Sequence, residues 1–342
     1  MTHSYPGTLH NFVSSYTSIL RKKLTAQTPR LVAFEYGTSS TPKPHSLLFI
    51  AGLTDGLYTV PYVQEVAKAL EPTEWSIFAL VLSSSYLGWG IGSLDRDVEE
   101  IGQCVNYVRD LKQKSLTSSN GAGKVVIMGH STGSQDVLHY LDSENPLPRD
   151  AKKDGVQGLN RPVVDGAIMQ APVSDRQAVL ETISGSSEAR EAYDKLVRFV
   201  QEQPAGAICP IELTGLVGLD PSTPVNARRF WSLASPDSPA KPSEDDLFST
   251  DLTDERLDET FGRVAKQGLL RTTLVALYSG NDEYAPKGVD KEALMARWKR
   301  AADAGEKKWD EGSGIIPGAS HNVKDEGQTW LIERVLNYLK RV

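Results

Sequence analysis

Apolar runs and helical patterns alternate along this chain. Nearly continuous runs of Val, Ile, Leu and Ala predict buried strands within residues 30–37, 45–56, 75–82, 123–129, 164–172 and 272–280. Apolar residues at three- and four-residue spacing predict helices at residues 61–70, 95–114, 134–141 and 329–342. The nearly continuous apolar runs are typical of parallel strands that are covered on both faces. We therefore expect an α/β fold, with a mostly parallel central sheet and helices on both of its faces.

A long insertion interrupts this alternation. About a hundred residues separate the strand that ends near Pro172 from the strand that begins near Thr272, far more than a crossover needs. We expect residues 1–172 and 271–342 to form one core and residues 173–270 to form a cap or lid, because ligands bind at the strand ends where this insertion emerges. A peripheral helical addition without contact to substrate is the alternative.

The two parts of the insertion differ in composition. Residues 174–203 have a helical pattern. Residues 233–255 are rich in Pro, Ser and Asp, so we expect a loose surface segment there.

The composition is that of a soluble globular protein. The 342 residues carry a net charge of −7, whereas non-specific nucleic-acid binding needs a basic face. No stretch is long and apolar enough to span a bilayer, and we expect a cytoplasmic protein. The sequence contains neither a C-x-x-C pair nor an H-E-x-x-H motif, so no metal site is expected. Residues 88–93 lack the third glycine of a dinucleotide-binding loop, so no cofactor is expected either.

A candidate nucleophile lies between a predicted strand and a predicted helix. The stretch Gly129-His130-Ser131-Thr132-Gly133 matches the pattern G-x-S-x-G. The glycines suit a tight strand-to-helix turn, where larger side chains would clash as the backbone doubles back. Ser131 would then project from the top of the sheet, with the N-terminal amides of the next helix directed at the reacting centre.

A nucleophilic serine needs a base, and in this layout the base follows the serine and the acid in the chain. His321 meets that order, because it lies in a glycine-bearing loop just before the last predicted helix. The turn is expected to direct the side chain of His130 away from Ser131. The remaining histidines do not fit by position: His3, His10, His45 and His139.

The acid that orients the base is expected on the loop after the penultimate predicted strand. Asp282 follows Gly280 closely and precedes Pro286, so we favour it. Glu283 is adjacent and chemically able, and Asp175 is a third candidate.

Ester hydrolysis also requires donors for the developing oxyanion. One is expected to be the backbone N–H of Thr132, the residue after the nucleophile. The other should come from the loop after residues 47–50, where Leu53 is our choice and Thr54 the alternate. Ala51 stands where many similar proteins carry histidine.

The layout resembles that of the α/β-hydrolase superfamily over nearly the whole chain. Four stretches of the chain are similar, more narrowly, to a mainly fungal branch of this superfamily. They are IAGLTDGLYTVPYV, SSYLGWGIGSLDRDVEEI, MGHSTGSQDV and YSGNDEYAP. That branch includes intracellular siderophore esterases, which hydrolyse ester bonds in fusarinine-type hydroxamate siderophores to release iron. By this resemblance Ser131, Asp282 and His321 take the roles of the family's catalytic triad.

The sequence therefore predicts a serine esterase whose substrate is a small-molecule ester, with an iron–siderophore complex as the favoured one. Any iron would arrive bound to the substrate. Three alternatives stay open. They are a different carboxylesterase or thioesterase, an acyltransferase that uses the same triad, and a non-catalytic binding protein on the same fold. The sequence does not indicate an oligomeric state.

Overall fold

The structure of the protein is a computed structural model, and it describes residues 5–13, 30–37, 42–115, 123–148, 159–324 and 326–342. Within these residues, eight strands form one sheet in the order β1-β2-β4-β3-β5-β6-β7-β8. Neighbouring strands from β4 to β8 are parallel, whereas β2 is antiparallel to both β1 and β4. The mostly parallel sheet predicted from the sequence is thus confirmed. The strands are β1 (Gly7–Val13), β2 (Arg30–Tyr36), β3 (His45–Ile50), β4 (Trp75–Val81), β5 (Val125–His130), β6 (Gly166–Gln170), β7 (Leu274–Ser279) and β8 (Gly314–Ile316).

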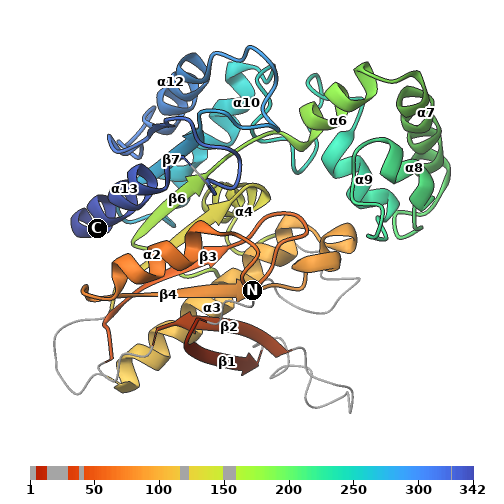
Figure 1. Ribbon diagram of the computed structural model, residues 1–342. Coiled ribbons are helices and arrows are strands. Elements are labelled where there is room, and N and C mark those ends of the chain that lie inside the picture. Colours follow the sequence, from red (N-terminus) through yellow and green to blue (C-terminus); the bar gives the residue numbers. More distant parts are fainter. Residues whose placement is uncertain (1–4, 14–29, 38–41, 116–122, 149–158, 325) are drawn as a thin grey trace.

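Helices cover both faces of this sheet (Figure 1). Successive residues of each buried strand point to opposite faces. In β5, Val126 and Met128 pack with one helix pair, while Val125 and Ile127 pack with the helices of the other face. The first pair is α2 (Tyr62–Leu70) and α13 (Gln328–Arg341), and the other face carries α3 (Leu94–Ser115), α4 (Thr132–Asp142) and α12 (Lys291–Ala302). Among the described residues, no helix combines the length and apolarity needed to cross a membrane.

The edge strand β1 was not expected from the sequence. Among residues 7–12 of this strand, Phe12 is the buried apolar side chain, whereas Leu9 is 61% exposed. The inward position at His10 instead carries a polar ring, which hydrogen-bonds to Tyr107 and Glu35. A strand held by polar contacts on its inner face lacks the apolar run on which the prediction relied.

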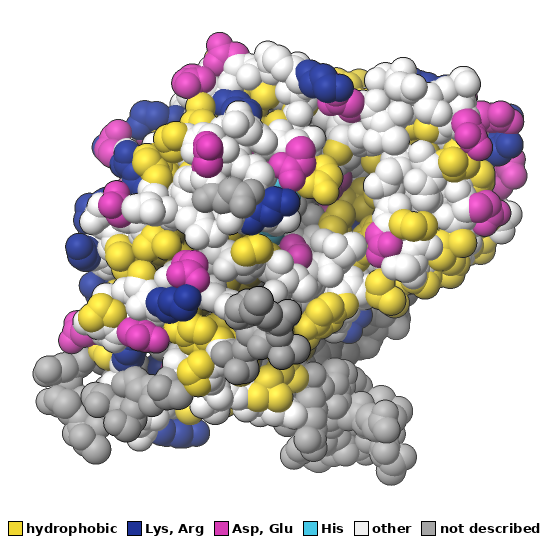
Figure 2. Space-filling view, in the orientation of Figure 1, with side chains coloured by type: hydrophobic (Ala, Val, Ile, Leu, Met, Phe, Trp, Pro, Cys, Tyr) yellow, Lys and Arg dark blue, Asp and Glu magenta, His cyan; other side chains and the backbone are white. Residues whose placement is uncertain are grey.

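Helices α6 to α9 form a lobe that lies to one side of the sheet (Figure 1). The lobe has an apolar cluster of its own, in which Leu196 and Phe230 are fully buried. Trp89, from the short 3₁₀ helix η1 (Tyr86–Ile91) of the core, joins the same cluster. Figure 2 shows a hollow between this lobe and the body of the molecule. The helices are α6 (Asp175–Ser184), α7 (Ser187–Glu202), α8 (Ile211–Leu216) and α9 (Ala227–Ala234).

The segment after α9 returns the chain to the body of the protein, and we call residues 235–253 the return segment. The expectation of a loose surface segment is wrong here, because Asp245, Asp246 and Phe248 are each at most 3% exposed. Its acidic side chains are neutralised by arginines of the lobe, with Arg229 Nη1 2.6 Å from Asp245 and Arg176 Nε 2.8 Å from Asp246. Local composition does not reveal partners that lie elsewhere in the chain.

The remainder of the insertion packs with the main core. Phe248 lies against Trp298 of α12, with the ring centroids 5.5 Å apart. Phe261 stacks on the same indole at 5.4 Å. The short helices of this part are α10 (Asp254–Glu259), η2 (Phe261–Arg263) and α11 (Val264–Gln267). Residues 173–270 therefore contain a separate helical lobe and a second part that belongs to the core.

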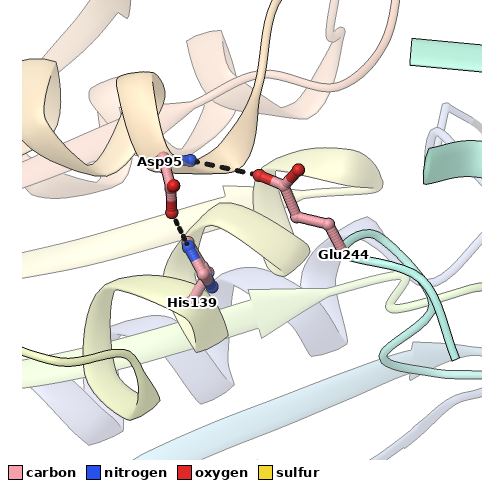
Figure 3. Close-up of side chains that lie close together, drawn as sticks. All are labelled: Asp95, His139 and Glu244. Atoms are coloured by element: carbon pink, nitrogen blue, oxygen red, sulfur yellow. Dashed lines mark hydrogen bonds and ion pairs between the residues drawn. The ribbon is translucent and has the colours of Figure 1, made fainter. Parts of the chain in front are cut away.

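A surface contact joins α3 and α4 to the return segment (Figure 3). His139 Nε2 lies 2.8 Å from Asp95 Oδ1, and the backbone N–H of Asp95 donates to Glu244 at 3.5 Å. Burial lowers the pKa of His139, but the hydrogen bond to Asp95 and the nearby carboxylates outweigh it, so the pKa is raised above 6.5. The hydrogen bond from His139 lowers the pKa of Asp95.

Replacing Asp245 by Ala is expected to lower the free energy of unfolding by about 3 kcal/mol, because Arg229 would stay buried without this partner. The matched control is Glu244→Ala, whose partner Arg228 is 45% exposed. That variant should lose less than about 1 kcal/mol. Urea unfolding measures both. Equal losses would mean that the Asp245 pair is not buried in solution.

The contact between Asp95 and His139 should stabilise the fold in acid but not in base. A raised histidine pKa contributes stability that is complete below 6.5 and is lost as the pH rises through the folded value. Asp95→Asn should therefore lower the free energy of unfolding by about 1 kcal/mol at pH 5.5. It should have little effect at pH 9. Asp110→Asn, on the exposed side of α3, is the control, and a loss of equal size at both pH values would contradict the prediction.

Candidate functional site

Ser131 occupies the turn between β5 and α4. Its φ of 54° lies in the left-handed region, which a non-glycine residue adopts only under constraint. A Cβ added to Gly129 would lie 2.0 Å from the carbonyl oxygen of Gly133, and one added to Gly133 would lie 2.4 Å from that of Ile50. Neither position tolerates a side chain, which explains the two glycines of the motif in this turn.

The loop after β3 lies directly against this turn. A Cβ on Gly52 would come within 2.8 Å of the Cβ of Ser131. Leu53 and Thr54, the two candidates for an oxyanion donor on this loop, line the same cavity as Ser131. Thr132 begins α4, so its backbone N–H is one of the first amides of the helix and is not needed by the helical ladder.

Asp282 and His321 are hydrogen-bonded to each other. The ring Nδ1 of His321 lies 2.8 Å from Oδ2 and 2.9 Å from Oδ1 of Asp282. Both residues are buried, with His321 4% exposed and Asp282 7% exposed. Asp282 follows β7 and is further held by the backbone N–H of Tyr284 at 3.0 Å. The structure therefore brings together the candidate base and the candidate acid, which are 39 residues apart in the chain.

The two other candidate acids bind different groups. Glu283 accepts the backbone N–H of His321 at 2.8 Å rather than contacting the imidazole ring. Asp175, at the start of α6, accepts a hydrogen bond from the side-chain amide of Gln135 at 2.8 Å. Burial raises the pKa of Asp175 to about 6.

A cavity of about 600 Å³ contains Ser131 and His321. One wall comes from the core, including Leu53, and the opposite wall comes from the lobe, including Val179 and Leu219. The cavity lies where the lobe meets the carboxyl ends of the parallel strands, as the α/β architecture predicts. A ligand in it would contact the core and the lobe together.

His130 also lines this cavity. Its ring lies 5.0 Å from the ring of His321. Nδ1 lies 2.5 Å from Gln170 Oε1, and Nε2 lies 2.9 Å from Asn322 Oδ1. Burial, followed by the proximity of His321, lowers the pKa of His130 to about 4, so the ring is neutral at pH 7. No sequence signal shows that Gln170 and Asn322 meet at this ring.

The other histidines lie away from this cavity or outside the described residues. His10 contacts Glu35, and His45 Nδ1 accepts a hydrogen bond from the backbone N–H of Lys124. His139 contacts Asp95. His3 lies outside the described residues.

Within the described residues, one group of side chains has the spacing of a metal site. Asp95, His139 and Glu244 place their ligand atoms within 4.8 Å of one another (Figure 3). These residues do not line the cavity, and Glu244 is already paired with Arg228 at 2.8 Å. Ion pairs explain why these three side chains lie together, and the group lies outside the cavity lining, so it cannot bind a metal ion there.

Comparisons with known proteins give relatives along the whole chain. The family model described as "Protein of unknown function (DUF1749)" matches residues 1–340. The chain is 46% identical over 353 residues to the fusarinine C esterase sidJ of Aspergillus fumigatus, covering 98% of this chain and 95% of that protein. It is 45% identical over 364 residues to the esterase AN6793 of Emericella nidulans, covering 98% and 93%.

Solved structures agree with these relatives. The siderophore hydrolase EstB from Aspergillus fumigatus superimposes with a TM-score of 0.83 at 45% identity, covering 99% of this chain and 98% of the other. An α/β-hydrolase fold protein of unknown function superimposes with a TM-score of 0.58 at 14% identity, covering 100% and 97%, which bears on the fold alone. The chain therefore has the α/β-hydrolase fold and belongs to the family described as "Protein of unknown function (DUF1749)".

Proposed function

We propose that this protein is a serine esterase that hydrolyses ester bonds of a fusarinine-type hydroxamate siderophore. The observation that carries the proposal is the hydrogen bond between His321 and Asp282 beside the cavity that holds Ser131. The names of the relatives that are about 46% and 45% identical support both the ester chemistry and the choice of substrate. Iron enters this reaction as cargo of the substrate.

In the proposed mechanism Ser131 Oγ attacks the ester carbonyl, and His321 takes the proton of the hydroxyl group. Asp282 accepts the Nδ1–H of His321, which leaves Nε2 as the basic nitrogen and stabilises the imidazolium that forms. His321 then gives the proton to the departing alcohol. Water attacks the acyl-enzyme with His321 as base and releases the acid.

The tetrahedral intermediate carries a negative oxygen that needs donors fixed in advance. The backbone N–H groups of Thr132 and Leu53 take this role in our proposal, with Thr54 as the alternate to Leu53. Support comes from the loop after β3, which lies against Ser131 through Gly52.

The α6–α9 lobe acts as the cap in this proposal. Its side chains form one wall of the cavity, so the alcohol or acyl part of a substrate would be held between lobe and core. The sequence predicts a cap over residues 173–270. In our proposal the cap is limited to the α6–α9 lobe, because the part of the insertion after α9 packs with the main core.

Incubating the protein with ferric and iron-free fusarinine C should give stepwise ester opening, detected by mass spectrometry as the addition of water at each step. Ser131→Ala should lower the rate by at least about a thousandfold, since the nucleophile is lost. A short-chain nitrophenyl ester runs alongside. Cleavage of the nitrophenyl ester alone would keep the esterase and reject the siderophore, and absence of both reactions would reject the esterase. Full activity of Ser131→Ala would reject Ser131 as the nucleophile.

The two adjacent carboxylates provide a matched pair of variants. Asp282→Asn should lower kcat by about a thousandfold or more, because a neutral amide no longer stabilises the imidazolium and its NH2 group can donate to Nδ1, which holds the ring in the wrong tautomer. Glu283→Gln should cost far less, since an amide oxygen can still accept the backbone N–H of His321. Steady-state kinetics on the same ester measures both. The reverse order would assign the triad acid to Glu283.

A further inference from the structure

The cavity that holds Ser131 is strongly acidic. None of the described residues that line it is Lys or Arg, and its two histidines are His130 and His321. Five carboxylates line it: Asp55, Asp175, Glu181, Asp220 and Glu283. A ligand that enters this cavity therefore meets excess negative charge in a partly desolvated space, where charges interact more strongly than in water.

Four of the five carboxylates bind other groups of the protein. Glu181 pairs with Lys287, Glu283 accepts the amide of His321, Asp175 accepts from Gln135, and Asp220 accepts from Ser222 and Thr223. These four are therefore explained by local structure. Asp55 is the exception.

The carboxylate of Asp55 is 19% exposed and has no hydrogen-bond donor among the described residues. Its nearest titratable neighbour is His130, whose Nε2 lies 3.9 Å away. That ring does not balance the charge, because burial keeps the pKa of His130 at about 4. Carboxylates that are mostly withdrawn from water are normally paired, so Asp55 lacks the partner that its environment calls for.

The backbone of Asp55 is nevertheless held firmly. Its carbonyl oxygen accepts the N–H of Tyr86 at 2.8 Å, and the hydroxyl of Tyr86 accepts the N–H of Leu57 at 2.9 Å. Its own N–H donates to the carbonyl oxygen of Gly52 at 3.1 Å. The unpaired carboxylate is therefore positioned in advance, on the same loop as the proposed oxyanion donor Leu53.

Two aromatic residues line the same cavity. Trp89 is 2% exposed, and its indole Nε1–H is buried without an acceptor anywhere in the described part of the chain. Tyr284 is 52% exposed and lies against His321, with the ring centroids 4.7 Å apart. Aromatic faces attract cations, and a buried N–H without a partner is suited to an oxygen of a ligand.

We propose that Asp55 binds a protonated amine of the ester substrate, with Trp89 and Tyr284 providing the aromatic surface around it. The inference rests on the proposed esterase function, because it concerns the same cavity. A metal ion is the weaker occupant, since within the described residues Asp55 belongs to no group of three or more ligating side chains. A carboxylate also suits an ammonium group, which donates several hydrogen bonds to it.

The amine would matter for the rate as well as for binding. An unbalanced carboxylate on the oxyanion loop repels the negative oxygen that develops on the ester carbonyl. A bound ammonium group cancels that charge. Esters with a protonated amine should therefore be favoured in the transition state over neutral esters of the same shape.

The test uses two 4-nitrophenyl alkylphosphonates of equal length, one ending in an ammonium group and the other in methyl. Attack by Ser131 Oγ forms the O–P bond and expels nitrophenolate, so labelling is followed by intact-mass spectrometry. The ammonium probe should label the protein about tenfold faster. This preference should shrink at high ionic strength because Asp55 is partly exposed.

Variants at Asp55 assign the preference to its charge. In Asp55→Asn the ratio of the two labelling rates should fall to about one. Asp55→Glu should keep the preference, which shows that charge rather than folding is responsible. Glu212→Gln, on the exposed surface of α8, removes the same charge away from the cavity and should keep the full ratio.

The possible outcomes separate the two proposals. Absence of labelling by both probes would overturn the proposed function, because Ser131 would not be reactive. Equal labelling of the unmodified protein by both probes would leave the nucleophile in place and overturn the amine inference. A preference that survives Asp55→Asn would overturn the role of Asp55.

Discussion

The buried side chain of Gln170, at the end of β6, holds the parts of the site in register. Its backbone oxygen accepts the N–H of Ser131 at 2.9 Å, which ties the strained turn to the neighbouring strand. Its Nε2 donates to Ser279 and to the carbonyl oxygen of His321, so its Oε1 is left as the acceptor for His130. Because this amide is fully buried, each of these bonds is made away from water. The turn at Ser131 and the loop that carries His321 are thereby held by one residue.

This arrangement also sets the protonation of His130. A neutral ring donates from one nitrogen only, and the shorter contact, with Gln170 Oε1, places that proton on Nδ1. Nε2 then faces the oxygen atoms of Asn322 and Asp55 without donating to them. A neutral ring next to His321 does not oppose the positive charge that His321 acquires in the proposed mechanism. Asp55 is left without a counter-charge for the same reason.

The lobe is joined to the core by buried ion pairs rather than by apolar contact alone. Arg229 of α9 and Arg176 of α6 both reach acidic residues of the return segment, Asp245 and Asp246. Such pairs require well-defined geometry, because an unpaired buried charge is costly. They place the wall that carries Val179 and Leu219 at a defined position over the cavity.

The sequence by itself determined strands β2 to β7, helices α2, α3, α4 and α13, and the turn at Ser131, because these depend on local apolar patterning and on two glycines that only a close backbone approach explains. It also supplied the chain order that pointed to His321. The sequence favoured Asp282 over Glu283 by its place between Gly280 and Pro286, but tertiary structure decided that Asp282 reaches the imidazole while Glu283 reaches a backbone amide, since both contacts depend on how the loop is folded. Tertiary structure decided too that residues 245–248 are buried and that Asp55 and Trp89 share a cavity. Each of these features depends on partners far away in the chain, and such partners cannot be predicted from local composition.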